Sequence, residues 1–154
     1  REMDEGALAK EIAPRIAEIT GHAPSDAQMI MLAKGMAGLK QRAKTLKDLA
    51  ESAAFYIVQR PLPLNDGAKK ILSADAKTLL GQLRKQIEGV SDFSAQNIET
   101  VIKEYATATG KKLGDAAQPL RAALSGSNVS PPIFEVASIL GKTETLGRID
   151  DVLQ

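Results

Sequence analysis

The sequence contains no cysteine and no tryptophan, and only five aromatic residues in 154. Without thiols the chain can form neither disulfides nor thiolate metal sites, which fits a reducing cytoplasm. No apolar run approaches the roughly 20 residues that a membrane span needs, and the N-terminus lacks the pattern of a signal peptide. We therefore expect a soluble, cytoplasmic protein whose core is built from Ala, Leu, Ile and Val.

Sequence signals of catalysis are also missing. No glycine-rich phosphate loop follows a strand, and no group of His or Cys has metal-ligand spacing. The single histidine, His22, lies in an expected loop with no convincing acid or nucleophile nearby. Asp150 and Asp151 are adjacent, so they would lie on different helix faces and could not act as a carboxylate pair. We expect no catalytic residue, no metal and no cofactor here, and a binding function instead.

The charge balance argues against indiscriminate coating of nucleic acid, because 20 basic and 19 acidic residues give a net charge of +1. The basic residues are nevertheless clustered between residues 34 and 47, where no acidic residue occurs. This cluster consists of Lys34, Lys40, Arg42, Lys44 and Lys47. A polyanion would be drawn to it, so its lysines are candidates for phosphate contacts. A solvated helix face would produce the same pattern.

Residues that start and stop helices recur along the chain, and no stretch alternates apolar and polar residues as a strand does. The pattern predicts an all-α fold. Capping boxes are expected at Ser25 with Gln28 and at Thr45 with Asp48. The other expected helix starts are Ser73, Ser94, Ser130 (with Pro131 at the first position) and Thr143. The expected helix ends are Gly89, Gly110, Gly126 and Gly141.

Residues 60–67 read Arg-Pro-Leu-Pro-Leu-Asn-Asp-Gly, which combines two prolines with a turn signal, so no helix can run through them. We expect two packed helical subdomains, residues 1–60 and 68–154, joined by a proline-rich linker over 61–67. Each predicted helix has one apolar stripe, as a bundle or helical cage requires. The start at Arg1 rather than at an initiator Met suggests a fragment of a longer protein.

The helix expected over residues 113–126 carries the first candidate for binding. Its apolar stripe consists of Leu113, Ala117, Leu120 and Leu124. Gln118 and Arg121 each lie about 100° round from that stripe, and because they are three residues apart they share a face. Gln can donate to and accept from a base edge, and Arg can grip or stack on a base. The alternative is structural: with Asp115, Gln118 has capping-box spacing, so it would bond the backbone and Arg121 would be an exposed charge.

The start of the next helix, residues 130–134, is the second candidate, because a helix N-terminus offers partial positive charge and free N–H groups. Pro131 and Pro132 have no N–H, so the available donors narrow to Ile133 and Phe134. The side chains of Ile133 and Phe134 would lie in the core or, alternatively, stack on bases.

These two segments together resemble a known family. Residues 117–126, Ala-Gln-Pro-Leu-Arg-Ala-Ala-Leu-Ser-Gly, followed by Ser130-Pro131 and by Phe-Glu-Val at 134–136, are similar to the anticodon-reading segment of bacterial glutamyl-tRNA synthetases. The similarity is also visible at 39–46 and 55–64. It implies a C-terminal, all-α anticodon-binding region of a class I ligase that attaches glutamate to its tRNA with ATP and Mg. The catalytic motifs of that family, His-Ile-Gly-His and Lys-Met-Ser-Lys-Ser, are absent from these residues.

The resemblance also implies roles for individual residues. Those that would contact the first two anticodon bases are Gln118, Arg121, Ser130, Pro131 and Ile133. Phe134 would support their pocket, and Arg42 would read the third base. That third contact decides whether the ligase accepts only tRNA(Glu) or also tRNA(Gln). Pro132 stands where the family is expected to have glycine.

Two other functions compete with this one. A helical protein-interaction module without RNA binding would fit the near-zero net charge. A free-standing enzyme is the other alternative, and an aminoacylation assay on this chain alone would test it. On the tRNA-binding hypothesis the chain is expected to act as a monomer.

Overall fold

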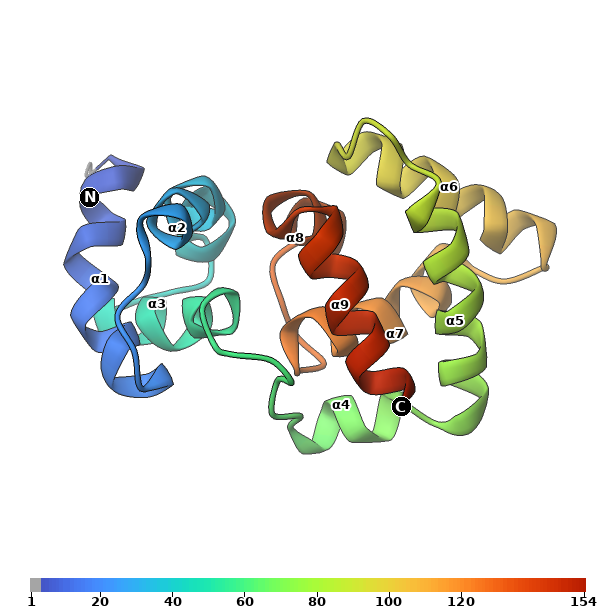
Figure 1. Cartoon of the computed structure of the whole chain (residues 1–154), viewed down its shortest axis with the longest axis horizontal. Coiled ribbons are helices and arrows are strands. Elements are labelled where there is room, and N and C mark those ends of the chain that lie inside the picture. Colours follow the sequence, from blue (N-terminus) through green and yellow to red (C-terminus); the bar gives the residue numbers. More distant parts are fainter. Residues whose placement is uncertain (1–3) are drawn as a thin grey trace. The chain divides into compact units, whose positions relative to one another are not determined.

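The structure, a computed structural model, describes residues 4–154, and these form nine α-helices, one short 3-10 helix and no strand. The all-α prediction is therefore confirmed (Figure 1). The first unit of the chain contains α1 (Glu5–Thr20), α2 (Asp26–Lys40), α3 (Leu46–Ala53) and the 3-10 helix η1 (Ala54–Tyr56). The second contains α4 (Asp66–Ile71), α5 (Ala74–Glu88), α6 (Ala95–Ala108), α7 (Leu113–Ser125), α8 (Ile133–Leu140) and α9 (Lys142–Leu153). Within the described residues, no helix has the length and apolar content needed to cross a bilayer.

The boundary between the two compact units falls after Gln59, one residue from the predicted position. Residues 61–67, expected as a linker, group with the second unit, Arg60–Gln154. There the backbone N–H of Asn65 donates to the carbonyl oxygen of Gly126 at 2.9 Å, and its side-chain amide donates to Ser127 Oγ at 3.0 Å. The proline-rich segment is thus attached to the end of α7 and leads directly into α4.

In the first unit, α1 packs against both α2 and α3. The inward face of α1 is a buried stripe of Leu8, Ile12 and Ile16 at helical spacing. Gly35 lets α2 approach the ring of Tyr56 closely, because a Cβ at that position would lie 3.0 Å from Tyr56 Cε2. This unit therefore has its own hydrophobic core.

The second unit is built around α7, which contacts α4, α5, α6, α8 and α9 and lies among them in Figure 1. Small side chains make this central position possible, because alanines let neighbouring helices approach closely. The buried residues of α7 are Ala116, Ala117, Pro119, Leu120, Ala122, Ala123 and Leu124. With so much of its surface covered, α7 is a firmly held platform for the few side chains that it leaves accessible.

A buried arginine ties α9 to the end of α7. Arg148 is 2% exposed, and its Nη1 donates to the carbonyl oxygen of Leu124 at 2.7 Å, while its Nε donates to Glu144 at 2.8 Å. Thr145, also buried, donates from Oγ1 to the carbonyl oxygen of Ala137 in α8 at 3.1 Å. Carbonyls in the last turn of a helix lack partners within that helix, so Arg148 supplies a donor where α7 needs one.

Most predicted helix ends are confirmed. Ser25 and Gln28 form a reciprocal capping box, with hydrogen bonds of 3.2 and 2.9 Å. Thr45, Ser73 and Ser94 are the N-caps of α3, α5 and α6. Gly126 ends α7 in the left-handed conformation, with φ of 73°. These positions follow from local chemistry, because a short hydroxyl side chain satisfies an otherwise unpaired N–H at a helix start.

The prediction for the start of α8 was wrong. The helix begins at Ile133 with Pro132 as its N-cap, and Ser130 does not cap it. A proline disfavours helical geometry in the residue before it, so Pro132 keeps Pro131 out of the helix. In the last helix the start differs by one residue, since α9 begins at Lys142 rather than Thr143.

Two helices lie outside the elements predicted from sequence. In α1, Asp4 accepts a hydrogen bond from the Ala7 N–H at 2.9 Å, and Pro14 lies within the helix. For α4 the signal was misinterpreted: Asn65 acts as an N-cap that accepts from Ala68 N at 2.8 Å, although Asn-Asp-Gly was expected to form a turn. Asn is favoured in both settings, so its presence alone does not separate them.

Candidate nucleic-acid interface

Gln118 and Arg121 lie on the same face of α7, as their spacing predicts. Gln118 is exposed and Arg121 is half-buried. The Nη1 of Arg121 donates to Gln118 Oε1 at 2.6 Å. The structural alternative for Gln118 required a helix start at Asp115, whereas the N-cap of α7 is Lys112. The amide oxygen of Gln118 is thus used to orient the guanidinium.

The same guanidinium reaches the loop before α8. Arg121 Nε donates to Ser130 Oγ at 3.0 Å, and the Ser130 hydroxyl donates to the carbonyl oxygen of Pro131 at 2.7 Å. Four of the residues assigned to the first two anticodon bases, Gln118, Arg121, Ser130 and Pro131, are therefore joined by one chain of hydrogen bonds. We call these four residues the Arg121 network.

The loop that carries Ser130 is braced by serines. Ser125 Oγ donates to the carbonyl oxygen of Arg121 at 2.7 Å and accepts from the Ser127 N–H at 3.2 Å. Ser127 Oγ in turn accepts from the Val129 N–H at 3.1 Å. Such local bonds fix the backbone between α7 and α8 and so limit the positions available to Ser130.

The other two residues assigned to this region differ in exposure. Ile133 is 2% exposed and belongs to the core, which is one of the two alternatives that the sequence left open. Phe134 is half-buried. Pro131 is buried as well, so Pro131 and Ile133 can shape the site mainly through their backbone and their packing.

In the first unit, the basic residues 34–47 lie on and just after α2. Lys34 is exposed on the helix, and Lys44 and Lys47 are exposed beyond it. Arg42 is exposed in the turn after α2, and its backbone N–H donates to the Leu39 carbonyl oxygen at 3.3 Å. Because these side chains are exposed, a polyanion could reach them.

One member of this basic segment is already paired. Lys40 Nζ lies 2.7 Å from Glu5 Oε2, and this hydrogen bond and the positive charge of Lys40 lower the pKa of the Glu5 carboxyl below its ordinary value. Both side chains are more than one-third exposed, so the pair is readily exchanged for contacts with water or another anion. Lys40 would have to leave Glu5 to bind a phosphate.

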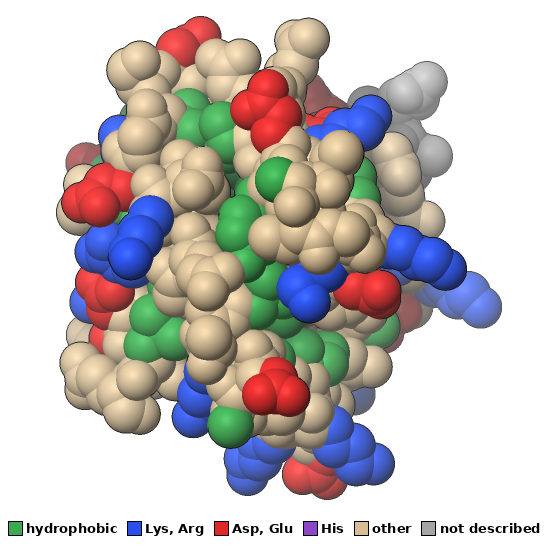
Figure 2. Space-filling model, turned by 90° about the vertical axis from the view of Figure 1, so that its right-hand side faces the viewer, with side chains coloured by type: hydrophobic (Ala, Val, Ile, Leu, Met, Phe, Trp, Pro, Cys, Tyr) green, Lys and Arg blue, Asp and Glu red, His purple; other side chains and the backbone are tan. Residues whose placement is uncertain are grey.

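Acidic and basic side chains are mixed on the face of the molecule seen in Figure 2, with hydrophobic side chains between them. On the surface of the second unit, Arg84 Nε donates a hydrogen bond to Asp150 Oδ1 at 2.5 Å. This hydrogen bond lowers the pKa of Asp150 and raises that of Arg84. On this face a polyanion would therefore meet local clusters of basic side chains rather than a uniformly basic surface.

The ring of His22 lies beside two backbone carbonyl oxygens. Its Nδ1 lies 3.1 Å from the carbonyl oxygen of Ala23, and its Nε2 lies 3.1 Å from that of Ile57. In the part of the chain that the structure describes, no three His, Cys, Asp or Glu side chains are grouped so that they could hold a metal ion. The Arg121 network remains the binding candidate that the sequence predicts.

An all-α scaffold that holds hydrogen-bonding side chains rigidly at a surface defines a helical binding module. Comparison with known proteins identifies the family to which this module belongs. The anticodon binding domain family matches residues 7–153, and this chain belongs to that family.

Proteins similar in sequence to this chain support its assignment to this family. The chain is 44% identical over 154 residues to a glutamate–tRNA ligase from Paramagnetospirillum magneticum, covering 99% of this chain and 32% of that protein. It is 47% identical over 120 residues to one from Methylobacterium radiotolerans, covering 78% and 25%. A glutamate tRNA ligase crystal structure from Elizabethkingia meningosepticum matches with a TM-score of 0.79 and 27% identity, over 98% of this chain and 29% of that one. The chain thus spans about a third of the length of the curated relatives it matches.

Proposed function

We propose that this chain is the C-terminal anticodon-binding region of a bacterial glutamate–tRNA ligase and that the Arg121 network reads the first two anticodon bases of tRNA(Glu). The hydrogen bonds from Arg121 to Gln118 and Ser130 support this role most directly. Unpaired RNA bases are read on their edges and faces by side chains held in place, and two partners orient this guanidinium before RNA arrives.

The remaining residues have supporting roles in this proposal. Ile133 and Phe134 shape the pocket at the start of α8, and Arg42 reads the third base. Arg42 would decide whether tRNA(Gln) is accepted together with tRNA(Glu). Contacts to phosphates come from the exposed lysines of the basic segment, Lys34, Lys40, Lys44 and Lys47.

The parent protein would be a class I aminoacyl-tRNA synthetase that works in the cytoplasm. Its catalytic part would use ATP and Mg to activate glutamate, and this chain would contribute RNA recognition without a cofactor of its own. We expect the chain to bind RNA as a monomer.

Binding of a labelled anticodon stem-loop of tRNA(Glu), measured by fluorescence anisotropy, tests the proposal. Replacing Arg121 with Ala should weaken binding by roughly 1–3 kcal/mol, because a base contact is lost. A matched control is Lys85→Ala, which removes a positive charge from an exposed position on α5 and should leave binding nearly unchanged. Equal binding by Arg121→Ala and the parent chain would rule out the assignment.

A second variant separates attraction to phosphate from base reading. Lys34→Ala should weaken binding of every stem-loop to a similar degree and reduce the slope of log affinity against log salt by about 0.7, the contribution of one contact to single-stranded RNA. Arg121→Ala should instead weaken the cognate loop most. If both variants affected all loops alike, neither residue would read bases.

The competing function is a helical protein-interaction module, which the net charge of +1 favours. It predicts no binding of the stem-loop at physiological salt, together with a stable protein partner in a pull-down. Charging of tRNA by this chain alone would instead show that it is a free-standing enzyme.

A further inference from the structure

The second unit contains a cavity of about 410 Å³ that the proposed RNA contacts do not use. Its walls come from the segment before α4, from α4 itself and from α5, α7 and α9. The apolar part of the lining consists of Pro61, Leu62, Leu64, Leu72, Ala123 and Val152. Sites for small molecules typically have volumes of about 300–1,000 Å³ and mostly apolar walls with a few polar groups, so this cavity has a suitable size and lining.

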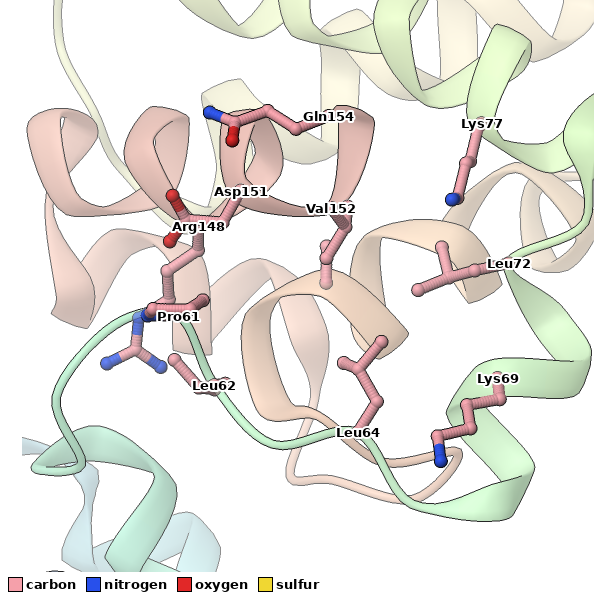
Figure 3. A pocket seen from close by; sticks show the side chains of 11 residues that line it. Pro61, Leu62, Leu64, Lys69, Leu72, Lys77, Arg148, Asp151, Val152 and Gln154 are labelled. Atoms are coloured by element: carbon pink, nitrogen blue, oxygen red, sulfur yellow. The ribbon is translucent and has the colours of Figure 1, made fainter.

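Two lysines are among the polar residues of the lining, together with Arg148, Asp151 and Gln154. Lys69 of α4 and Lys77 of α5 both line the cavity, and Figure 3 shows them at two ends of one side of it, with Leu72 between them. Within residues 4–154, neither lysine forms an ion pair with a carboxylate. Lys77 is half-buried, so part of its stem lies against the protein while its ammonium group stays accessible.

The other two charged residues of the lining are already compensated. Arg148 pairs with Glu144 at 2.8 Å, and Asp151 accepts from Arg60 Nε at 2.9 Å. Lys69 and Lys77 are therefore the cationic side chains of the lining that form no ion pair within residues 4–154, and they lie beside an apolar wall. An anionic group would be attracted to the ammonium groups while an attached apolar body covered the leucines and the valine.

We propose that this cavity binds a small organic anion with an apolar body, such as an aryl or alkyl carboxylate, sulfonate or phosphate ester. The anionic group lies at the side of the cavity that carries Lys69 and Lys77, where both attract it, and the apolar part lies against Leu64, Leu72 and Val152. A small molecule is favoured over a macromolecule because the lining residues come from five parts of the fold and surround one cavity of limited volume.

A pair of fluorescent probes tests this proposal on the 154-residue chain. Anilinonaphthalene sulfonate has an anionic group on an apolar body, and phenylnaphthylamine is a neutral molecule of similar shape. We expect saturable binding of the sulfonate at one site per chain. We expect weaker binding of the neutral probe, which should not respond to changes at Lys69 or Lys77.

Charge-removing variants locate the site. Lys69→Gln and Lys77→Gln should each weaken sulfonate binding about threefold, and the double variant about tenfold, since partly exposed ion pairs contribute modestly. The matched control is the double variant Lys70→Gln, Lys85→Gln, which removes two exposed lysines of the same helices that do not line the cavity. Its affinity for the sulfonate should stay within twofold of the parent value.

Three results would overturn the proposal. The first is equal loss of sulfonate binding in both double variants, which would indicate attraction to overall charge. The second is unchanged binding in the Lys69→Gln, Lys77→Gln variant, or binding that does not saturate. The third is displacement of the sulfonate by the anticodon stem-loop in a manner that depends on Lys69 and Lys77, which would make the cavity part of the RNA surface. Far-UV circular dichroism of each variant verifies that the helices remain folded.

Discussion

Replacing Arg148 with Met tests how firmly α7 is held in the second unit. Methionine has a similar length and fills the buried space, but it cannot donate to the Leu124 carbonyl oxygen, 2.7 Å from Arg148 Nη1. Hydrogen bonds involving a charged group contribute roughly 1.5–3 kcal/mol, and a buried carbonyl deprived of its donor adds a desolvation cost. Glu144 is one-third exposed and can turn to water, so its loss of a partner contributes little. We expect the free energy of unfolding to fall by about 2–4 kcal/mol.

Urea unfolding at neutral pH, followed by far-UV circular dichroism, measures this change. The control is Arg84→Met, which removes an arginine from a surface pair with Asp150 and should lower stability by no more than about 1 kcal/mol. If Arg148→Met lost no more stability than Arg84→Met, the bond to Leu124 would not be important for holding α7 and α9 together.

Three further variants probe other contacts. Ser130→Ala removes the acceptor for Arg121 Nε and should weaken stem-loop binding by about 1 kcal/mol, with Ser130→Thr restoring it, as measured by anisotropy. Asp150→Asn should lower the free energy of unfolding by at most about 1 kcal/mol at pH 7, because Arg84 lowers the pKa of the Asp150 carboxyl in the folded state. This stabilisation is present above the ordinary Asp pKa of about 3.9 and is lost as the pH falls through the lowered pKa. The stabilities of the parent chain and the variant, measured by urea unfolding at decreasing pH, should therefore converge in acid. Gly126→Ala should cost about 2 kcal/mol in urea unfolding, since φ is 73° and the added Cβ would collide with the Pro63 carbonyl oxygen. No loss in that variant would mean that the chain before α4 can move away from α7.

Local chemistry explains why much of the fold could be predicted from sequence. Ser25, Ser73 and Ser94 cap helices because their hydroxyls reach the backbone N–H three residues ahead, and this contact does not depend on the rest of the chain. The start of α8 could not be predicted in this way. The Ser130 hydroxyl bonds the Pro131 carbonyl oxygen and Arg121 instead, and the partner from α7 is not visible in the local sequence.

The candidate site was only partly accessible to sequence reasoning. Helical spacing placed Gln118 and Arg121 on one face, but it also allowed Gln118 to bond the backbone. Tertiary packing surrounds α7 with five other helices and brings Arg121 to Ser130 across the loop. Neither feature can be predicted from local sequence. The cavity beside Lys69 and Lys77 had no sequence signal, because its walls come from segments far apart in the chain.

We propose that Arg121 reads RNA bases from a position fixed by Gln118 and Ser130. The most direct test is a cycle in which the parent chain and Arg121→Ala each bind the tRNA(Glu) anticodon stem-loop and loops altered at the first or second anticodon base. We predict that one of these base changes weakens the parent chain by roughly 1–3 kcal/mol and has little further effect on Arg121→Ala. Equal penalties for each base change in the two proteins would contradict base reading by Arg121, because Arg121 would then contribute to binding without distinguishing bases.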